Sequence, residues 1–501
     1  MAPQPLPRDL RQALRLLEAE PARPWRIGEL AAACGTAPRT LQKRFRAFLG
    51  CGPVHFLRDL RLDNARRALL PGPGRARITE IAASCGFNHL GRFSTLYSRR
   101  FGESPSKTLQ RCRRVPAPAP PFTARTVDRT TIAVLPFDLI GLDAGRAQGI
   151  AEEIAAALCQ ARWLGVTSPA AARYHLRGKV RSDDAGRLRV TVLMTDAGAG
   201  RHLWADTFDG TLADLFAFEE RTAVRIACAI QPSLRGAEID RARRKDRAAL
   251  NAWELTMRAL GCVLSFEPRL ESLALELFDE AMERAPQDPL PAALASWCRG
   301  LRGGHHFTPR PTEERTTARI LADRAATLAP ADSLAETLLA SGYTLAHDLA
   351  AADFHADRAL RLDGGSAWAW GRSGWIKAYG GQHDEAIERF QIARALAPDD
   401  PLAFLWAIGI GSAQLERARP SEAVAWYTRA LRERPTALWN NRFLAAAHAL
   451  AGHKHEARRT FADFNRSYPD VTIAQVRIGL PHTTRFLDFV ADGLESAGMR
   501  P

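Results

Sequence analysis

The second half of this 501-residue chain repeats a short motif at an almost constant spacing. Ala-x-x-Leu-Ala-Pro at 325–330 recurs at 393–398, and Ala359 lies midway between the first alanines of these two copies. Further copies begin at Ala430, after 37 residues, and at Phe464, after 34, and an earlier one begins at Ala281, 44 residues upstream across an insertion at 303–314. Repeats of this length are units of two helices that bury their apolar sides against the next unit. The pattern therefore predicts a helical solenoid over residues 251–500.

The spacing resembles that of tetratricopeptide repeats, whose period is about 34 residues. The copy at 367–400 fits that consensus best, at Trp370, Gly374, Ala386, Phe390, Ala393 and Pro398. Small residues let the paired helices approach, aromatic rings fill the space between them, and the proline ends the second helix. The resemblance implies five or six repeats and a protein or peptide partner. We expect core positions, not a cofactor site, for the tryptophans of this region: Trp368, Trp370, Trp375, Trp406, Trp426 and Trp439.

Positive charge is concentrated at the other end of the chain. The whole chain carries +14 at pH 7, and residues 1–126 hold 23 of its 69 Lys and Arg but only 8 of its 55 Asp and Glu. This first quarter accounts for the entire excess. Such a local excess favours a nucleic acid as the partner of the N-terminal region.

Residues 78–105 have the pattern of a helix-turn-helix, with the turn at Gly86. An apolar stripe repeats every four residues along the second helix, at Phe93, Tyr97 and Phe101. The opposite face carries polar and cationic side chains that suit base edges and phosphates, namely His89, Arg92, Thr95 and Arg99. In such a unit the second helix enters the major groove of DNA.

Residues 27–49 repeat this arrangement around Gly35, and Pro38 is expected in the first turn of the second helix. Leu41, Phe45 and Phe48 are predicted to face inward. The outward stripe is formed at i, i+3, i+4 and i+7 by Arg39, Gln42, Lys43 and Arg46. An amphipathic helix over 8–20, with Leu10, Leu14 and Leu17 on one side, and a long helix over 53–70 complete the region.

The pattern G-F-x(5)-F-x(3)-[FY]-x(4)-G-x-[ST]-P is formed by Gly86, Phe87, Phe93, Tyr97, Gly102, Ser104 and Pro105. It resembles the second half of the AraC/XylS-type DNA-binding domain, and residues 27–49 resemble its first half. The resemblance covers residues 8–112 and implies double-stranded DNA as partner, with bases read by the stripe that begins at Arg39. In the second helix-turn-helix, the positions that correspond to this stripe hold Leu90, Gly91, Arg92 and Thr95. This predicts fewer base contacts and more phosphate contacts in the second half of the domain. No β-rich sugar-binding barrel precedes the domain, so sugar binding is not inferred.

An Ala-Pro-rich stretch at 113–130 reads as a linker, and an α+β domain with a helical extension is expected over 131–250. Strands are predicted at 131–137 and at Leu-Gly-Val-Thr-Ser (164–168), a helix at 149–161 and a hairpin around the turn at 183–186. Their order and motifs resemble the TolB-N-terminal-like module over 131–235. A relay or ligand-binding role and a spacer role remain equally open. Glu152, Glu153, Asp183 and Asp184 are expected at the surface or in the turn.

Other chemistry is not indicated. The eight cysteines are scattered without a C-x-x-C pair, and His305, His306, His453 and His455 lack further metal ligands at suitable spacing. No cofactor, metal or catalytic motif is expected, nor an export signal or membrane-spanning run, which favours a reducing cytoplasm. The oligomeric state cannot be derived from these motifs.

The fold class predicted from the sequence is mainly α and multidomain, with a double helix-turn-helix, a middle α+β domain and a C-terminal α-solenoid. The leading hypothesis is a sequence-specific DNA-binding transcription regulator whose middle and C-terminal regions sense a signal or dock a protein. The alternative is a tetratricopeptide scaffold whose basic head binds nucleic acid without specificity. An enzyme is a third hypothesis, suggested only because TolB-like modules accompany nucleotide cyclases.

Overall fold

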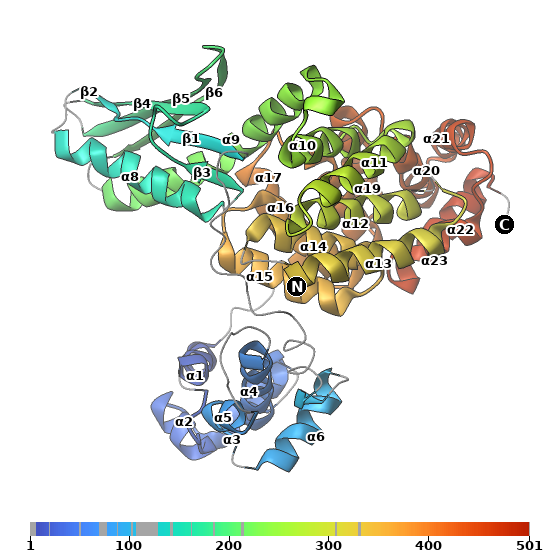
Figure 1. Cartoon of the computed structure of the whole chain (residues 1–501). Coiled ribbons are helices and arrows are strands. Elements are labelled where there is room, and N and C mark those ends of the chain that lie inside the picture. Colours follow the sequence, from blue (N-terminus) through green and yellow to red (C-terminus); the bar gives the residue numbers. More distant parts are fainter. Residues whose placement is uncertain are drawn as a thin grey trace. The chain divides into compact units, whose positions relative to one another are not determined.

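The computed structural model describes residues 7–19, 21–49, 52–69, 78–87, 89–101, 104–106, 129–140, 144–161, 163–183, 186–211, 215–305, 308–328 and 332–499. The chain forms two compact units, Met1–Ala124 and Arg125–Pro501 (Figure 1). The predicted linker at 113–130 lies outside the described residues except for Arg129 and Thr130. In the part of the chain that is described, no helix is both long and apolar enough to cross a membrane.

The first unit consists of short helices arranged as two similar halves. Their bounds are α1 (Arg8–Ala19), α2 (Ile27–Ala33), α3 (Pro38–Leu49), α4 (Pro53–Leu69), α5 (Ile78–Ser84) and α6 (Leu90–Phe101). These helices confirm the predicted pair of helix-turn-helices, including the start of α3 at Pro38.

Each half of the first unit has its own hydrophobic core. The first core contains Leu10, Leu17, Leu41, Phe45 and Leu57, and the second contains Leu62, Ile81, Ala82, Phe93 and Tyr97. The helix α4 belongs to both halves, because its N-terminal part enters the first core and its middle enters the second. The predicted core residues Leu14, Phe48 and Phe101 have side chains outside the described set.

The second unit begins with a mixed sheet. Its strands are β1 (Thr130–Val134), β2 (Asp138–Ile140), β3 (Leu164–Val166), β4 (Tyr174–Ser182), β5 (Arg187–Asp196) and β6 (His202–Thr211). The order is β3-β1-β4-β5-β6, and β2 also pairs with β4. The strand β1 is parallel to both neighbours, whereas β4, β5 and β6 run antiparallel. The predicted hairpin is confirmed by the β4–β5 ladder, which ends at Ser182 opposite Leu188.

The strand predicted at 131–137 is shorter in the structure. β1 ends at Val134, and β2 pairs with the same neighbour, β4, from Asp138, so the predicted strand is confirmed but its extent through residues 135–137 was wrong. Between the two strands lie Pro136, which has no backbone N–H to donate, and Phe137, whose ring packs on Gly178 of β4. A Cβ at Gly178 would lie 2.0 Å from that ring. Glycine at position 178 therefore leaves room on β4 for the buried side chain of Phe137.

Two helices, α8 (Ala144–Gln160) and α9 (Leu215–Arg244), pack against one face of this sheet (Figure 1). Along β4, buried Tyr174, Leu176 and Val180 alternate with exposed Arg177 and Arg181, as expected for an antiparallel sheet with one covered face. The helix α9 also packs on the solenoid helices α10 and α17. The resemblance of this region to the TolB module stays a prediction.

The rest of the second unit is a stack of antiparallel helix pairs. Their bounds are α10 (Ala252–Val263), α11 (Pro268–Arg284), α12 (Pro289–Gly304), α13 (Pro311–Leu328), α14 (Ser333–Leu345), α15 (Leu349–Leu362), α16 (Ala367–Tyr379), α17 (His383–Leu396), α18 (Ala403–Glu416), α19 (Pro420–Glu433), α20 (Asn441–Leu450), α21 (Lys454–Ser467), α22 (Ile473–Gly479) and α23 (Thr484–Ala497). The repeat positions occupy the second helix of successive pairs and are all fully buried: Ala281, Ala325, Ala359, Ala393, Ala430 and Phe464. The predicted solenoid is confirmed.

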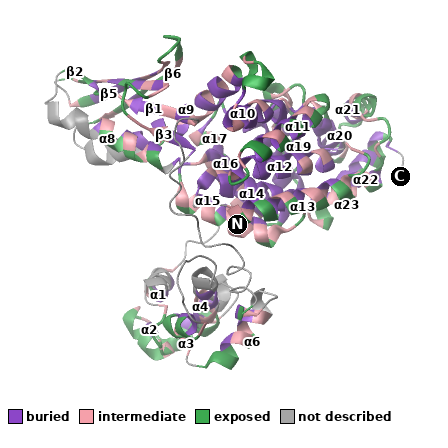
Figure 2. Ribbon diagram, in the orientation of Figure 1, coloured by how far each residue is buried: buried purple, intermediate pink, exposed green. Residues whose placement is uncertain are grey.

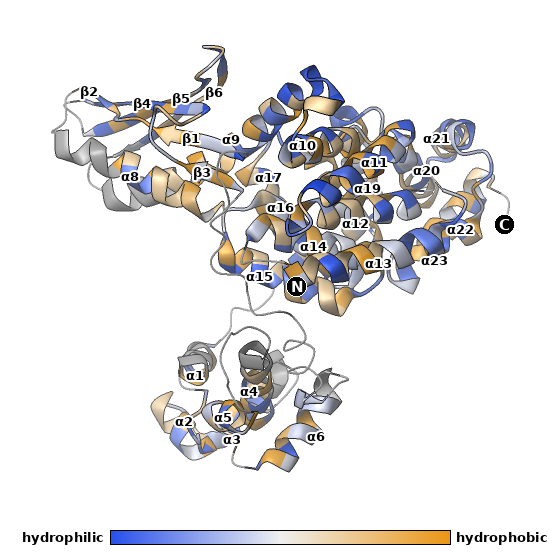
Figure 3. Ribbon diagram, in the orientation of Figure 1, coloured by the Kyte–Doolittle hydropathy of each residue, from blue (hydrophilic) through white to orange (hydrophobic). Residues whose placement is uncertain are grey.

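Close packing explains the small residues of the repeat. A Cβ at Gly374 of α16 would lie 2.8 Å from the ring of Phe390 on α17, so glycine is needed for these two helices to meet. The first helix of each pair is enclosed by its neighbours, and every residue of α18 is buried. Figure 2 shows this concentration of buried residues, and Figure 3 shows hydrophilic residues gathered on outward sides.

The tryptophans of the solenoid only partly follow the prediction. Trp368, Trp375, Trp406 and Trp439 are buried, whereas Trp370 and Trp426 are partly exposed. His305, at the end of α12, stacks on Trp439 with ring centroids 3.9 Å apart. His306 lies outside the described residues.

Candidate nucleic-acid interface

The two turns of the first unit are built on glycines with positive φ. Gly35 has φ +64° and Gly86 has φ +83°, a conformation that other residues adopt only under strain. A Cβ at Gly35 would meet nothing within 4 Å, whereas one at Gly86 would lie 2.8 Å from the carbonyl oxygen of Ala22. A side chain at Gly86 would therefore not be crowded by the two helices that flank the turn. The crowding comes instead from the segment that precedes α2.

Arg61, in the middle of α4, connects the two halves. Its Nε donates to the carbonyl of Pro21 at 2.7 Å, its Nη2 to Arg23 at 2.7 Å and its Nη1 to Gly86 at 3.0 Å. Two of these carbonyls precede the first helix-turn-helix, and the third belongs to the turn of the second. Arg61 thereby fixes the spacing of the two recognition helices. The sequence did not reveal it, because an arginine within a long helix usually faces solvent.

A second anchor fixes α3 within the first half. Asp9 at the start of α1 is buried, accepts a hydrogen bond from the backbone of Leu10 at 2.9 Å, and pairs with Arg44 of α3. Burial acts to raise the pKa of Asp9, but the hydrogen bonds from Arg44 and Leu10 outweigh it and hold the pKa below its ordinary value. Arg44 is therefore committed to the protein, unlike its neighbours on the outward stripe.

The predicted stripe of α3 is exposed where it is described. Arg39, Gln42 and Lys43 are all exposed, while Leu41 and Phe45 on the opposite side are 0% exposed. No hydrogen bond or ion pair with described residues occupies the three polar side chains. The side chain of Arg46 lies outside the described set. The helix thus presents one long amide and two cations, which are the side chains that read guanine and adenine edges.

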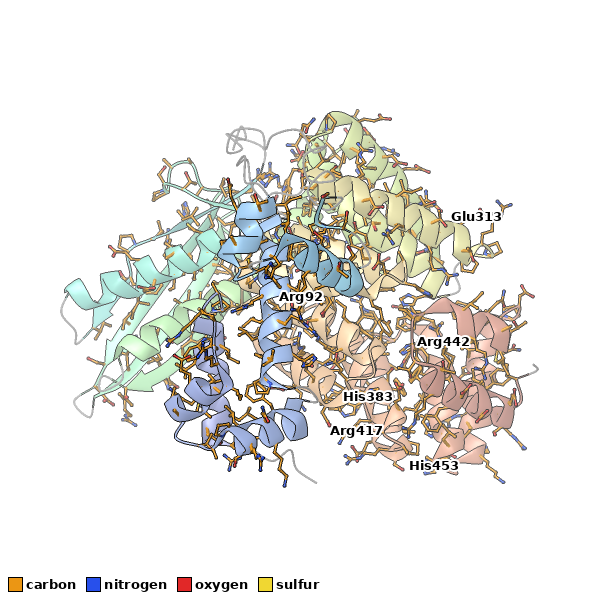
Figure 4. All side chains as sticks on the ribbon, turned by 90° about the horizontal axis from the view of Figure 1, so that it is seen from below. Arg92, Glu313, His383, Arg417, Arg442 and His453 are labelled. Atoms are coloured by element: carbon orange, nitrogen blue, oxygen red, sulfur yellow. The ribbon has the colours of Figure 1, made fainter. Side chains whose placement is uncertain are left out.

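The outward face of α6 is different. His89, Leu90, Arg92 and Thr95 are exposed, and Leu90 keeps 42% of its surface accessible. The Thr95 hydroxyl donates to the carbonyl of Gly91 at 3.0 Å, so its proton is already used within the helix. Arg92, labelled in Figure 4, is the long cation of the described face. The side chain of Arg99 is outside the described residues.

Burial gives a more accurate correspondence between α3 and α6 than the sequence did. Phe93 and Tyr97 are 0% exposed and are equivalent to Leu41 and Phe45, which precede them by 52 residues in the sequence. The turn glycines, Gly35 and Gly86, are only 51 residues apart. The second half has one extra residue between its turn and its recognition helix. The counterparts of Arg39, Gln42, Lys43 and Arg46 are therefore Gly91, Ser94, Thr95 and Ser98.

The N-terminal region resembles known regulators. A family model described as a helix-turn-helix domain matches residues 30–111. The "Probable thc operon regulatory protein" of Rhodococcus erythropolis is 39% identical over 110 residues, which are 22% of this chain and 33% of that protein. A solved structure of a probable AraC family transcriptional regulator from Rhodopseudomonas palustris CGA009 is 38% identical, with 21% of this chain and 96% of that chain covered and a TM-score of 0.20.

Other matches extend beyond that region. A thermophilic TPR protein from Thermus thermophilus is 20% identical, with 42% of this chain and 98% of that chain covered and a TM-score of 0.29. A protein of Rhizobium meliloti, named provisionally as adenylate cyclase 3, is 28% identical over 180 residues, which are 32% of this chain and 30% of that protein. The chain spans about one third of the length of these two curated relatives.

Proposed function

We propose that this chain, whose N-terminal domain is an AraC-type helix-turn-helix domain, regulates transcription by binding a specific duplex DNA sequence. The observation that carries the proposal is the face of α3, on which Arg39, Gln42 and Lys43 are exposed and unpaired among the described residues, while Leu41 and Phe45 are held in the core. A helix fixed on one side and polar on the other can present its side chains to base edges at a defined register.

The two halves of the domain contribute unequally to this proposal. The helix α3 reads bases, since its exposed side chains are long and carry free donors. At the matching positions of α6, Gly91 has no side chain and Thr95 has committed its proton to a backbone carbonyl. The second half therefore acts mainly on the phosphate backbone, through Arg92, Arg99 and His89. Both helices would face one side of the duplex, with Arg61 setting the distance between them.

The second unit supplies the regulatory part of the proposal. Its sheet and its solenoid share the helix α9, on which Arg235 pairs with Asp400 of the solenoid at 2.8 Å, while Glu238 pairs with Arg173 of the sheet region at 2.8 Å. We assign this unit the sensing of a signal or the docking of a protein partner. The proposal keeps the cytoplasm as the expected location, in line with the scattered cysteines of the sequence.

Binding-site selection from random duplex DNA, with the full chain at near-physiological salt, tests this function. The proposal expects one enriched motif, with the strongest preferences confined to one half of it. A protein that enriches no motif and whose binding disappears as salt rises would instead be a scaffold with a non-specific basic head, because purely phosphate-based binding depends steeply on salt. Nucleotide turnover by the purified chain above background would revive the cyclase hypothesis.

A further inference from the structure

The mixed sheet of the second unit has one covered face and one exposed face. The helices α8 and α9 pack on the face that carries Tyr174, Leu176 and Val180 (Figure 1). The opposite face, hereafter the open face, is formed by the alternate side chains of β4, β5 and β6 that point away from these helices. Its exposed members include Arg177, Arg181, Arg187, Arg189 and Thr191. A partner can therefore reach this side of the sheet.

Positive side chains form a row on the open face. Arg177, Lys179 and Arg181 are alternate residues of β4, so all three project from the same side of the sheet. Successive members of such a row are about 7 Å apart, similar to the separation of neighbouring phosphates along one strand of DNA. The strand β5 adds Arg189, which lies directly opposite Arg181 in the antiparallel ladder.

Acidic neighbours neutralise only part of this charge. The Nε of Arg189 donates to Asp209 of β6 at 2.6 Å, so the cation of β5 has a carboxylate beside it. None of the three cations of β4 forms an ion pair with a residue that the structure describes. Asp138 of β2 lies opposite Lys179 in register, but the two side chains form no ion pair. The row on β4 thus keeps its charge available.

The position of Arg181 is unfavourable in the protein alone. Like charges directly opposite each other in an antiparallel pair destabilise the sheet, and Arg181 faces Arg189. An anion between the two guanidinium groups would replace this repulsion with attraction. A merely solvated surface would mix both signs, as residues 127–501 do overall with 46 Lys and Arg and 47 Asp and Glu. The arrangement therefore favours an anionic partner.

The phosphates of DNA are the anions that fit this face best. Thr191 and Thr207 lie opposite each other on it with their Oγ1 atoms 3.4 Å apart, and threonine hydroxyls join Arg and Lys in contacts to phosphate oxygens. The same chain carries the helix-turn-helix domain. DNA held by that domain offers its flanking phosphates to the second unit at a high effective concentration.

We propose that the open face binds the phosphate backbone of DNA outside the site that the helix-turn-helices read. Arg177 and Arg181 donate to phosphate oxygens, and Lys179 adds a third positive charge. Such contacts add affinity and salt dependence but no base preference. The inference rests on the proposed function, since it takes DNA as the partner, and it gives the middle domain a direct part in DNA binding.

Titration of the full chain with two duplexes tests this role. The short duplex holds only the selected site, and the long duplex adds about 30 bp on each side. The parent chain should bind the long duplex about tenfold more tightly at near-physiological salt and should protect flanking DNA from hydroxyl radicals.

The variant that combines Arg177→Gln with Arg181→Gln should lose most of this gain and the flanking protection. Its slope of log affinity against log salt on the long duplex should fall by about 2, while its affinity for the short duplex should stay unchanged. The variant should melt at a temperature no lower than the parent chain, because Arg181→Gln removes the like charge opposite Arg189. That result separates loss of DNA contact from loss of fold.

The matched control combines Arg244→Gln with Arg458→Gln. Both arginines are exposed, on α9 and α21 respectively, and the control loses the same charge as the variant. It should bind both duplexes as the parent chain does, which separates the open face from the net charge of the protein.

Three results would overturn the proposal. They are equal affinity of the parent chain for both duplexes, equal affinity of variant and control for the long duplex, and a loss of binding to phosphatidylserine vesicles in the variant without any loss of DNA affinity. The last result would assign the open face to a membrane surface. Failure of the proposed function is distinct, because it is the absence of an enriched motif, and variant and control can still be compared on long DNA of arbitrary sequence.

Discussion

The two helix-turn-helices of the first unit share a scaffold but differ on the face that meets the partner. Both pack two residues of 0% exposure against their own core, Leu41 and Phe45 in α3, Phe93 and Tyr97 in α6. Outside, α3 carries Arg39 and Lys43 where α6 carries Gly91 and Thr95. The scaffold is thus the same in both halves, while long donors occupy these matched positions in only one of them. Under the proposed function, base reading and helix placement are separable tasks in this domain.

Replacing Arg61, which connects the two halves, should have the largest effect on stability and DNA affinity. Arg61→Met removes the hydrogen bonds to Pro21, Arg23 and Gly86, and should lower the free energy of unfolding of the first unit by about 3 kcal/mol. Affinity for the selected DNA should fall about 100-fold, because the halves lose their common spacing. Chemical denaturation and DNA titration measure the two effects. Arg61→Lys keeps the positive charge but not the branched guanidinium, so it should restore only part of the stability and part of the DNA affinity. Full restoration of both would show that the charge alone matters.

Removing the proposed base-contacting residue Arg39 from the first half should produce the next largest effect. Arg39→Ala should cost about 1–3 kcal/mol of discrimination at one base pair and leave the melting temperature unchanged, since the side chain is exposed. Selection with the variant should lose the preference at that position and retain the others. A uniform loss of affinity over all sequences would instead place Arg39 on a phosphate.

Adding a base-contacting side chain to α6 tests the difference between the two halves more sharply. Gly91→Arg places an arginine at the position of α6 that is equivalent to Arg39 of α3. A Cβ at Gly91 meets nothing within 4 Å, so the fold should be retained. Selection should then show a new preference for guanine in the second half of the site, with about tenfold higher affinity for DNA that carries it. The control is Gly28→Arg on α2, whose Cβ position is equally open. If both variants gain affinity without a new base preference, α6 does not lie in the groove.

A phosphate contact should have a smaller and uniform effect. Arg92→Gln should weaken binding a few-fold for every sequence and reduce the slope of log affinity against log salt by about 1. Titrations at several salt concentrations, with selected and scrambled DNA, measure both. A loss restricted to the selected sequence would make Arg92 a base reader and would bring the two halves closer in function.

The smallest effect concerns the anchor of the first half. The pKa of Asp9 is lowered in the folded chain, so its pairing contributes stability above the unfolded carboxyl pKa of about 3.9 and loses it as the pH falls through the folded value. Asp9→Asn should cost no more than about 1 kcal/mol at neutral pH, because Arg44 is partly exposed. Denaturation curves at pH 7 and at pH 3 should differ less for the variant than for the parent chain. Identical curves for both proteins would exclude this pair as a stabilising contact.

Much of the fold could be predicted from periodic residues. The alanines of the solenoid recur at a nearly constant interval because each packs at an equivalent point between helices, and all are fully buried. The helix-turn-helices were visible for a similar reason, since the turn glycines and apolar stripes recur at fixed distances. The period of the apolar residues and the positions of the turn glycines depend on local backbone geometry and on packing between neighbouring helices. Both can be predicted directly from the sequence.

Contacts between distant residues could not be predicted in this way. Arg61 bonds to carbonyls that are far from it in the chain, at Pro21 and Gly86, and backbone acceptors leave no pattern in side-chain identity. The packing of Phe137 on Gly178 is a second example, because this contact exists only once the strands are in register. The sequence analysis placed Leu90, Gly91, Arg92 and Thr95 at the positions of the α3 stripe, whereas burial of Phe93 and Tyr97 sets the phase of α6.

The unequal roles of α3 and α6 are the central claim, and a base-pair scan of the selected site tests it most directly. Each base pair of the enriched sequence is replaced in turn, and the affinity of the full chain is measured at fixed salt. The account predicts losses of about tenfold to 100-fold at several positions in one half of the site and less than about threefold throughout the other. Equal losses in both halves would show that α6 reads bases as α3 does, and would contradict the account.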